Sequence, residues 1–174
     1  MKLNFSNRHF LKFALVLLLA AFFNSSCGYR IVGSEFLTFQ SVTIASVKNQ
    51  TYEPKLEERL HIALSREFIR QGIEVKIKDG DVDLEATVTL FQLGAVGAVD
   101  EIIREQEIIL EADIKVDDQG KIAMFKSMRS PLKITFQSTG SVNEAAARKD
   151  IATEKACSEI AKEIVGQLIV RYAK

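Results

Sequence analysis

Cys27 has the strongest case for chemistry in this sequence, because of the residues that precede it. An apolar run at residues 13–23 comes shortly before it, and cations without any acidic residue come before that run: Lys2, Arg8 and Lys12. The run is too short to span a hydrocarbon core, which needs about 20 residues. This order predicts a secretory signal peptide over residues 1–26. The alternative is a buried N-terminal helix of a cytosolic domain.

The residues directly before Cys27 lack the A-x-A pattern of ordinary signal cleavage. They resemble the bacterial lipobox, in which the cysteine thiol is diacylated and the new terminal amine is acylated. Ser25 and Ser26 match the small residues of that motif, and Asn24 stands where an aliphatic residue is usual. Each buried methylene contributes about 0.8 kcal/mol and a single chain binds marginally, so two or three chains are needed. We therefore predict lipidation at Cys27 and one lipid-anchored domain over residues 27–174.

The second cysteine, Cys157, has no partner if Cys27 is acylated. It lies on the apolar side of a predicted helix, where cysteine packs as a small hydrophobic side chain. A disulfide between Cys27 and Cys157 is the alternative for both residues. Gly28 follows Cys27, and a residue other than Asp at this place resembles lipoproteins that are sorted to the outer membrane. We therefore expect the domain at the outer membrane, on its periplasmic side.

No other residue pattern indicates catalysis. His61 is the only histidine after residue 26, and we expect it on the flank of a helix. The sequence contains no cluster with metal-ligand spacing, no G-x-S-x-G, no glycine-rich phosphate loop and no H-E-x-x-H. The formal net charge is zero, so no basic excess indicates a nucleic-acid partner. We expect a protein that is not an enzyme and that needs no metal or cofactor.

Two segments have the apolar spacing of helices. Residues 54–71 begin with Pro54 and end before Gly72, a residue typical of helix termination. Residues 141–172 open with Ser141 and Glu144, the S-x-x-E pattern of a capping box. The apolar stripe of this second helix is predicted to contain Ile151, Cys157, Ile160, Ala161, Ile164, Val165, Leu168, Ile169 and Tyr172.

The remaining segments alternate as strands do. Residues 41–47, 72–77, 83–99 and 108–116 fit this pattern, and so do residues 121–127, which residues 131–140 continue or replace. Gly94 and Gly97 lie inside the long third segment, where glycine often marks a bulge or a bend. Strands with one apolar face and helices with one apolar side fold into two layers. The sequence predicts an α+β two-layer sandwich: a mixed sheet of about four strands, with both helices on one face.

Two stretches carry a resemblance to a known family. The chain "CGYRIVGS" from Cys27, and "VKNQTYEPKLEERL" running into the first helix, resemble the lipopolysaccharide (LPS)-assembly lipoprotein family LptE. This resemblance implies a plug inside the LptD β-barrel that aids barrel assembly and contacts lipopolysaccharide. It also implicates basic residues near the middle hairpin and the start of the last helix, here Arg104, Arg148 and Lys149.

Two further readings of the sequence remain. Lys126, Arg129 and Lys133 form a second basic cluster that could contact the phosphates of lipopolysaccharide. An adaptor that faces the periplasm and activates a cell-wall enzyme or a secretion pore would share the anchor and the α/β body. Co-purification of a large β-barrel would distinguish the LptE-like role from this alternative.

Overall fold

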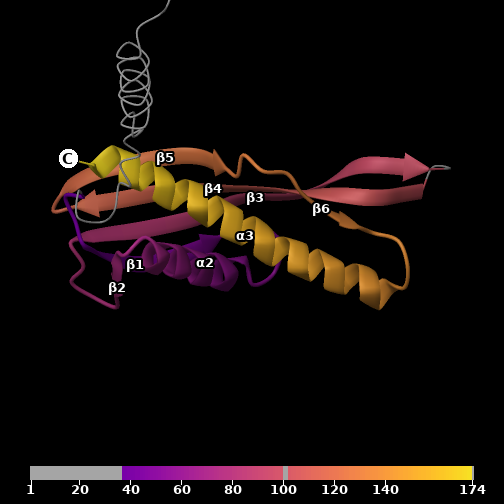
Figure 1. The fold of residues 1–174 in the computed structure, drawn as a ribbon, viewed down its shortest axis with the longest axis horizontal. Coiled ribbons are helices and arrows are strands. Elements are labelled where there is room, and N and C mark those ends of the chain that lie inside the picture. The colour runs from indigo at the N-terminus through magenta and orange to yellow at the C-terminus, as the bar shows by residue number, and fades with distance from the viewer. Residues whose placement is uncertain (1–36, 100–101, 174) are drawn as a thin grey trace, which may run out of the picture. The chain divides into compact units, whose positions relative to one another are not determined.

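The computed structural model describes residues 37–99 and 102–173, which all fall in one compact unit, Val32–Lys174. The predicted signal peptide and Cys27 lie outside the described residues. The elements, in chain order, are β1 (Ser41–Asn49), α2 (Leu56–Arg70), β2 (Glu74–Lys76), β3 (Val82–Val99), β4 (Ile102–Asp118), β5 (Lys121–Arg129), β6 (Ile134–Gln137) and α3 (Val142–Tyr172) (Figure 1).

The six strands form one mixed sheet in the order β2-β1-β3-β4-β5, with β6 also paired to β4. β1 runs parallel to β2 and β3, and the other pairs are antiparallel. The predicted two-layer α+β class is confirmed, and the predicted count of about four strands is too low. β4 is 17 residues long, so β5 pairs with its second half and β6 with its first half. The segment after Pro131 therefore forms a strand of its own.

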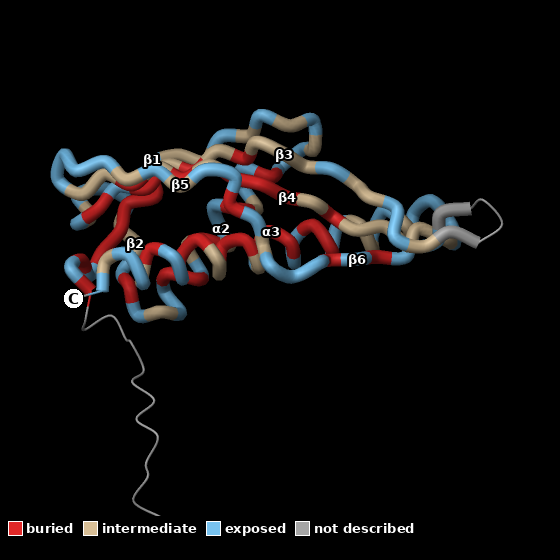
Figure 2. The backbone as a smooth tube through the Cα atoms, turned by 90° about the horizontal axis from the view of Figure 1, so that it is seen from above, coloured by how far each residue is buried: buried red, intermediate tan, exposed pale blue. Residues whose placement is uncertain are grey.

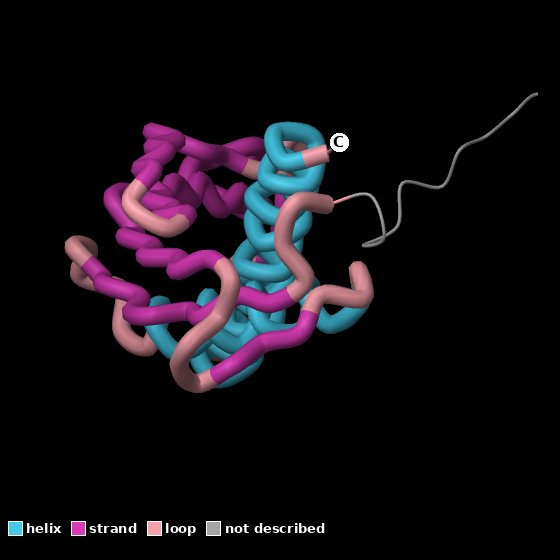
Figure 3. The backbone as a smooth tube through the Cα atoms, turned by 90° about the vertical axis from the view of Figure 1, so that its left-hand side faces the viewer, coloured by secondary structure: helices cyan, strands magenta, loops and turns pink. Residues whose placement is uncertain are grey.

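The core lies between the sheet and the two helices, and the strands curve around one side of them (Figure 3). Alternate residues of β3 and β4 turn their side chains inward, and helix residues four positions apart meet them. Side chains with no exposed surface include Leu56, Leu60, Leu64, Phe68, Leu84, Ile114, Ile160, Ile164 and Leu168. Ile151, which was predicted in the apolar stripe, is 68% exposed. It shares the outer face of α3 with Lys155 and Ser158, because a helix returns to the same side every 3.6 residues.

Local backbone conformations and capping hydrogen bonds explain where the two helices start and end. α2 starts at Leu56 rather than at Pro54, because Lys55 takes a left-handed conformation with φ of 64°. Its end is confirmed: Gly72 has φ of 77°, and the backbone N–H of Ile73 donates to the Phe68 carbonyl at 2.9 Å, a Schellman motif. The predicted capping box at the start of α3 is also confirmed.

β3 and β4 form a long hairpin that continues past the buried part of the sheet. We call its end, residues 92–99 and 102–106, the hairpin arm. Buried positions concentrate beneath the helices and give way to intermediate and exposed positions toward the arm (Figure 2). The strand register shifts on both sides of Gly97, which confirms the predicted irregularity at this glycine.

Candidate functional site

Arg104 and Arg148, which are far apart in the sequence, both contact the chain at the end of β6, Arg104 through its backbone carbonyl and Arg148 through its side chain. The Ser138 backbone N–H donates to the Arg104 carbonyl at 3.0 Å, and Arg148 Nε donates to the Gln137 carbonyl at 2.8 Å. Both groups belong to the single peptide bond between Gln137 and Ser138, so this peptide lies between the two arginines. Arg104 is exposed, and it is the residue of β4 that the register skips between the pairs Gly97–Glu105 and Ala98–Ile103.

Arg148 is held by backbone carbonyls rather than by a carboxylate. Its Nη2 also donates to the carbonyl of Thr139. The capping box lies beside it: the Ser141 N–H donates to Glu144 Oε2 at 3.0 Å, which holds the pKa of Glu144 below its ordinary value. A guanidinium has five N–H donors, so Arg148 keeps others for a ligand. The start of α3 and β6 together fix its position.

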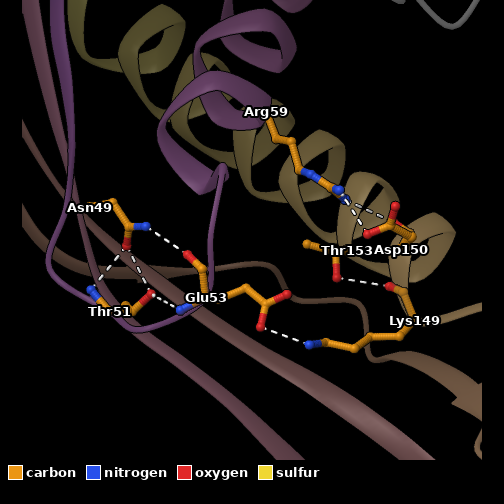
Figure 4. A network of polar contacts seen from close by, with 7 residues as sticks. All are labelled: Asn49, Thr51, Glu53, Arg59, Lys149, Asp150 and Thr153. Carbon is orange, nitrogen blue, oxygen red and sulfur yellow. Dashed lines mark hydrogen bonds and ion pairs between the residues drawn. The ribbon is translucent and has the colours of Figure 1, made fainter. Parts of the chain in front are cut away.

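Lys149 points to a different neighbour, the loop between β1 and α2. Its Nζ lies 2.7 Å from Glu53 Oε2 and 5.7 Å from the centroid of the Phe91 ring (Figure 4). Its side chain is 32% exposed, and that of Glu53 is 17% exposed. The structure therefore separates Lys149 from Arg148: the Lys149 charge is matched by a carboxylate.

The sequence did not single out Glu53 as a site residue, and its position depends on Asn49. Asn49 Oδ1 accepts hydrogen bonds from the Thr51 N–H at 2.9 Å and from Thr51 Oγ1 at 2.8 Å. Its Nδ2 donates to the Glu53 carbonyl at 2.7 Å (Figure 4). Asparagine and threonine often bond nearby backbone in this way, so the N-x-T spacing was the available signal. This loop carries the fully exposed side chain of Tyr52.

A second ion pair joins α2 to α3. Arg59 Nη2 lies 2.8 Å from Asp150 Oδ1, and Arg59 Nη1 donates to the Asp150 carbonyl at 3.1 Å. Thr153 Oγ1 donates to the Lys149 carbonyl at 2.8 Å within α3 (Figure 4). The Arg59–Asp150 and Lys149–Glu53 pairs together tie α2 and the loop before it to the first half of α3 at two points.

The second basic cluster does not present three free charges. Arg129 forms an ion pair with Glu111, and Lys133 Nζ lies 3.3 Å from Glu107 Oε2. Lys126 is exposed on β5. Two of the three cations are thus matched by carboxylates of β4, and the cluster is a weaker candidate for an anion site than Arg104.

Cys157 is 1% exposed, and its burial raises the pKa of the thiol to about 12. His61 lies on the exposed side of α2. Among residues 37–99 and 102–173, no three His, Cys, Asp or Glu side chains gather as metal ligands would. No helix in the described part of the chain has the length and apolar character needed to cross a membrane.

Solved structures share this fold at low sequence identity. Rare lipoprotein B from Shewanella oneidensis matches with a TM-score of 0.52 and 12% identity, over 75% of this chain and 95% of that protein. A protein from Xanthomonas campestris matches with a TM-score of 0.51 and 15% identity, over 76% of this chain and 84% of that protein. No curated protein matches the sequence.

A sequence-family comparison gives the assignment. Residues 39–168 match the lipopolysaccharide-assembly family LptE, a range that runs from just before β1 nearly to the end of α3. It includes the hairpin arm, β6 and the start of α3, where Arg104 and Arg148 lie. The chain therefore belongs to the LptE family of lipopolysaccharide-assembly lipoproteins.

Proposed function

We propose that this protein is an outer-membrane lipoprotein that plugs an LptD-like β-barrel, helps that barrel to assemble, and contacts lipopolysaccharide during its insertion into the outer leaflet. Acyl chains on Cys27 hold the domain on the periplasmic side of the membrane. Family membership supports the general role, which is not enzymatic. A plug needs a rigid body with polar surface, and the single buried core beneath two helices supplies rigidity.

The observation that carries the lipopolysaccharide contact is that the backbone of Arg104 and the guanidinium of Arg148 bond the two sides of the Gln137–Ser138 peptide. Lipopolysaccharide carries phosphates, and arginine binds phosphate oxygens through two parallel N–H groups. Arg104 is exposed and has no recorded ion pair with the described residues. Arg148 is already oriented by two carbonyls, so little side-chain entropy is lost when it binds a ligand. Lys149 contributes less, because Glu53 already matches its charge.

The assembly role is tested by capture from detergent-solubilised outer membranes. We expect the full-length chain to bring down one large β-barrel protein, identified by mass spectrometry. A Cys27→Ala variant, which has no acylated thiol, should lose membrane attachment. Recovery of a cell-wall synthase or a secretin in place of the barrel would favour the adaptor alternative. An intact N-terminal methionine or an unmodified thiol at Cys27 would contradict the anchor.

The lipopolysaccharide contact is tested with Arg104→Glu. We expect roughly tenfold weaker binding or more, because a hydrogen bond between charged groups contributes about 1.5–3 kcal/mol. Arg148→Glu should also weaken binding, and its helix content must be checked because Arg148 supports the loop before α3. Lys121→Glu is the control, since this exposed cation lies where β4 turns into β5, at the other end of β4 from the arm. Equal binding by Arg104→Glu and the wild type would exclude Arg104.

A further inference from the structure

A cleft between α2 and α3 brings several basic side chains together at a place that the proposed function does not use. Its volume is about 300 Å³. The two helices run in the same direction. Arg59 contacts Asp150 near their starts, and Arg70, further along α2, interacts electrostatically with Glu159, further along α3. A parallel pair of this kind brings successive turns of α2 against successive turns of α3.

Four cations line this cleft. Arg59, Arg66 and Arg70 come from one side of α2, and Lys162 comes from α3. Arg70 Nη2 lies 2.7 Å from Glu67 Oε2, and Lys162 Nζ lies 2.7 Å from Glu159 Oε1. Among residues 37–99 and 102–173, no hydrogen bond or ion pair is recorded for Arg66. One guanidinium is therefore available without breaking an existing contact.

The carboxylates at the cleft differ in their surroundings. Glu67 is 6% exposed and is engaged by Arg70 and by Gln71 Nε2 at 2.8 Å. Glu154 is exposed, and the described residues offer it no recorded ion pair. Of the two acidic groups that line the cleft, only Glu154 has a charge without a matching cation. Asp150 and Glu159, which pair with Arg59 and Lys162, bring the count to four cations and four carboxylates, so an anion would be held by the N–H donors that the cations keep, above all those of Arg66.

We propose that this cleft binds the phosphate group of an organic phosphate, with Arg66 as its principal ligand. A phosphate ester carries a charge of about −1.5 to −2 and three strong acceptor oxygens, which suits several converging cations. Arg66 can donate two parallel N–H groups, and Arg70 and Lys162, although each is paired with a carboxylate, keep further N–H donors at the same cleft. The Ser158 hydroxyl, also on the lining, can donate to a further oxygen.

The size of the cleft argues for an organic phosphate rather than the inorganic ion. About 300 Å³ is the lower end of the range for small-molecule sites. Ile62 and Ala63 supply apolar lining beside the cations, which fits a carbon body attached to the phosphate. This body could belong to a lipid headgroup or to a soluble phosphate ester, since both present the same chemistry.

This site is separate from the Arg104–Arg148 pair. Lys162 follows Arg148 by about four helical turns of α3, roughly 20 Å along the helix axis, and only the Arg59 end of the cleft, which contacts Asp150, lies near Arg148. Substitutions in one site should therefore leave the other unchanged, and the two proposals can fail independently.

The test is calorimetric titration of the full-length chain in neutral detergent with two probes. Glycerol 3-phosphate represents the soluble ester, and dihexanoylphosphatidylglycerol represents the lipid headgroup, with dihexanoylphosphatidylcholine as its zwitterionic control. We expect saturable binding of one probe, weakened by added salt. The tighter probe identifies the source of the phosphate. Absence of saturable binding by both probes would overturn the proposal.

Two variants with opposite expected effects make the test specific. Arg66→Gln should bind the probe about tenfold more weakly, because it removes a charged hydrogen-bond donor. Glu154→Gln should bind it about twofold to fivefold more tightly, because it removes a repelling charge at the surface. Lys121→Gln, which changes an exposed cation outside both sites, should match the wild type. Unchanged binding by Arg66→Gln would refute the site, and equally tight binding of glutarate would refute the preference for phosphate.

Discussion

The part of the β3–β4 hairpin beneath the helices and the hairpin arm are made from the same two strands but differ in their surroundings. Beneath the helices, Leu84, Val88 and Ile114 have no exposed surface. In the arm, the described side chains are intermediate or exposed, and Val96 is 51% exposed. The register is continuous from Asp83 to Val88 and shifts repeatedly beyond it.

This difference means that the covered part of the hairpin mainly stabilises the fold, whereas the arm is the part that can serve binding. Burial removes apolar surface from water at about 25 cal/mol per Å², so the covered part of the hairpin contributes most of the stabilisation. The arm contributes little of that surface, and its main chain is irregular around Gly97. Its residues can therefore change for the benefit of a partner or ligand without much effect on folding. Arg104 lies in this permissive region, next to the more constrained Arg148.

The largest expected effect on the free energy of unfolding comes from opening a cavity in the core between the helices and the sheet. Ile160→Ala removes a side chain with no exposed surface, and we expect it to lower the free energy of unfolding by about 2–5 kcal/mol. Val96→Ala in the arm should change it by less than about 0.5 kcal/mol. Urea unfolding followed by circular dichroism measures both, as a midpoint shift at constant slope. Comparable losses in the two variants would mean that the arm is part of the cooperative core.

A smaller effect should come from adding one methyl group to Gly80, in the turn just before the covered part of β3, and to Gly97 in the arm. A Cβ on Gly80 would lie 2.6 Å from the Thr43 backbone nitrogen and 2.8 Å from the Val42 carbonyl carbon. Gly80→Ala should therefore reduce stability by about 1–3 kcal/mol, as overpacking does. A Cβ on Gly97 would meet nothing closer than Glu105 Cβ at 3.7 Å.

For that reason we expect Gly97→Ala to unfold at the same urea concentration as the wild type or slightly above it. Replacement of glycine by alanine reduces the freedom of the unfolded chain, an effect worth about 0.4–1 kcal/mol where the conformation permits. A marked loss of stability in Gly97→Ala, or none in Gly80→Ala, would reverse the comparison.

The smallest effect concerns pH and lies at the edge of the covered region. Asp81 Oδ2 accepts hydrogen bonds from the backbone N–H groups of Gln40 at 2.8 Å and Ser41 at 2.9 Å, which lower the pKa of its carboxyl below 3.8. The folded state therefore favours the ionised form. This stabilisation is present above pH 3.8 and is lost as the pH falls through the lower folded-state pKa.

Asp81→Asn should remove part of the acid dependence of the unfolding midpoint below about pH 4. Val96→Ala, which changes no titrating group, should keep the full dependence. Thermal unfolding measured across this acid range tests both variants. A slope in Asp81→Asn as steep as that of the wild type would show that other carboxyl groups account for the acid sensitivity.

Most elements could be predicted because their signals are local. The four-residue spacing of Leu56, Leu60 and Leu64 reports one buried helix face, and the S-x-x-E pattern at Ser141 reports a helix start. The predicted number of strands was wrong for a non-local reason. The residues near Ile134 do not indicate that β4 is long enough to pair with a further strand beside β5. Ile151 was predicted in the core because it is apolar, but it lies nine residues from Ile160 and therefore on the opposite side of α3.

The candidate site was predictable only in part. Arg104 and Arg148 were suggested by a family resemblance, but the peptide that joins them lies in β6, which the sequence did not define as a separate strand. The partner of Lys149, Glu53, is distant in the chain and belongs to a loop. Long-range ion pairs leave no periodic signal, so sequence patterns cannot assign them.

The sequence by itself determined the helices, the alternating strands, the two-layer class and the absence of recognisable catalytic motifs, because these depend on the types of residues close together in the chain. Tertiary structure decided which cations remain available to a ligand. Arg66 and Lys162 have the same formal charge, but only Lys162 lies beside a carboxylate that matches it. Availability depends on what folding places within a few ångströms of a charged group, since electrostatic interactions weaken with distance and with exposure to water.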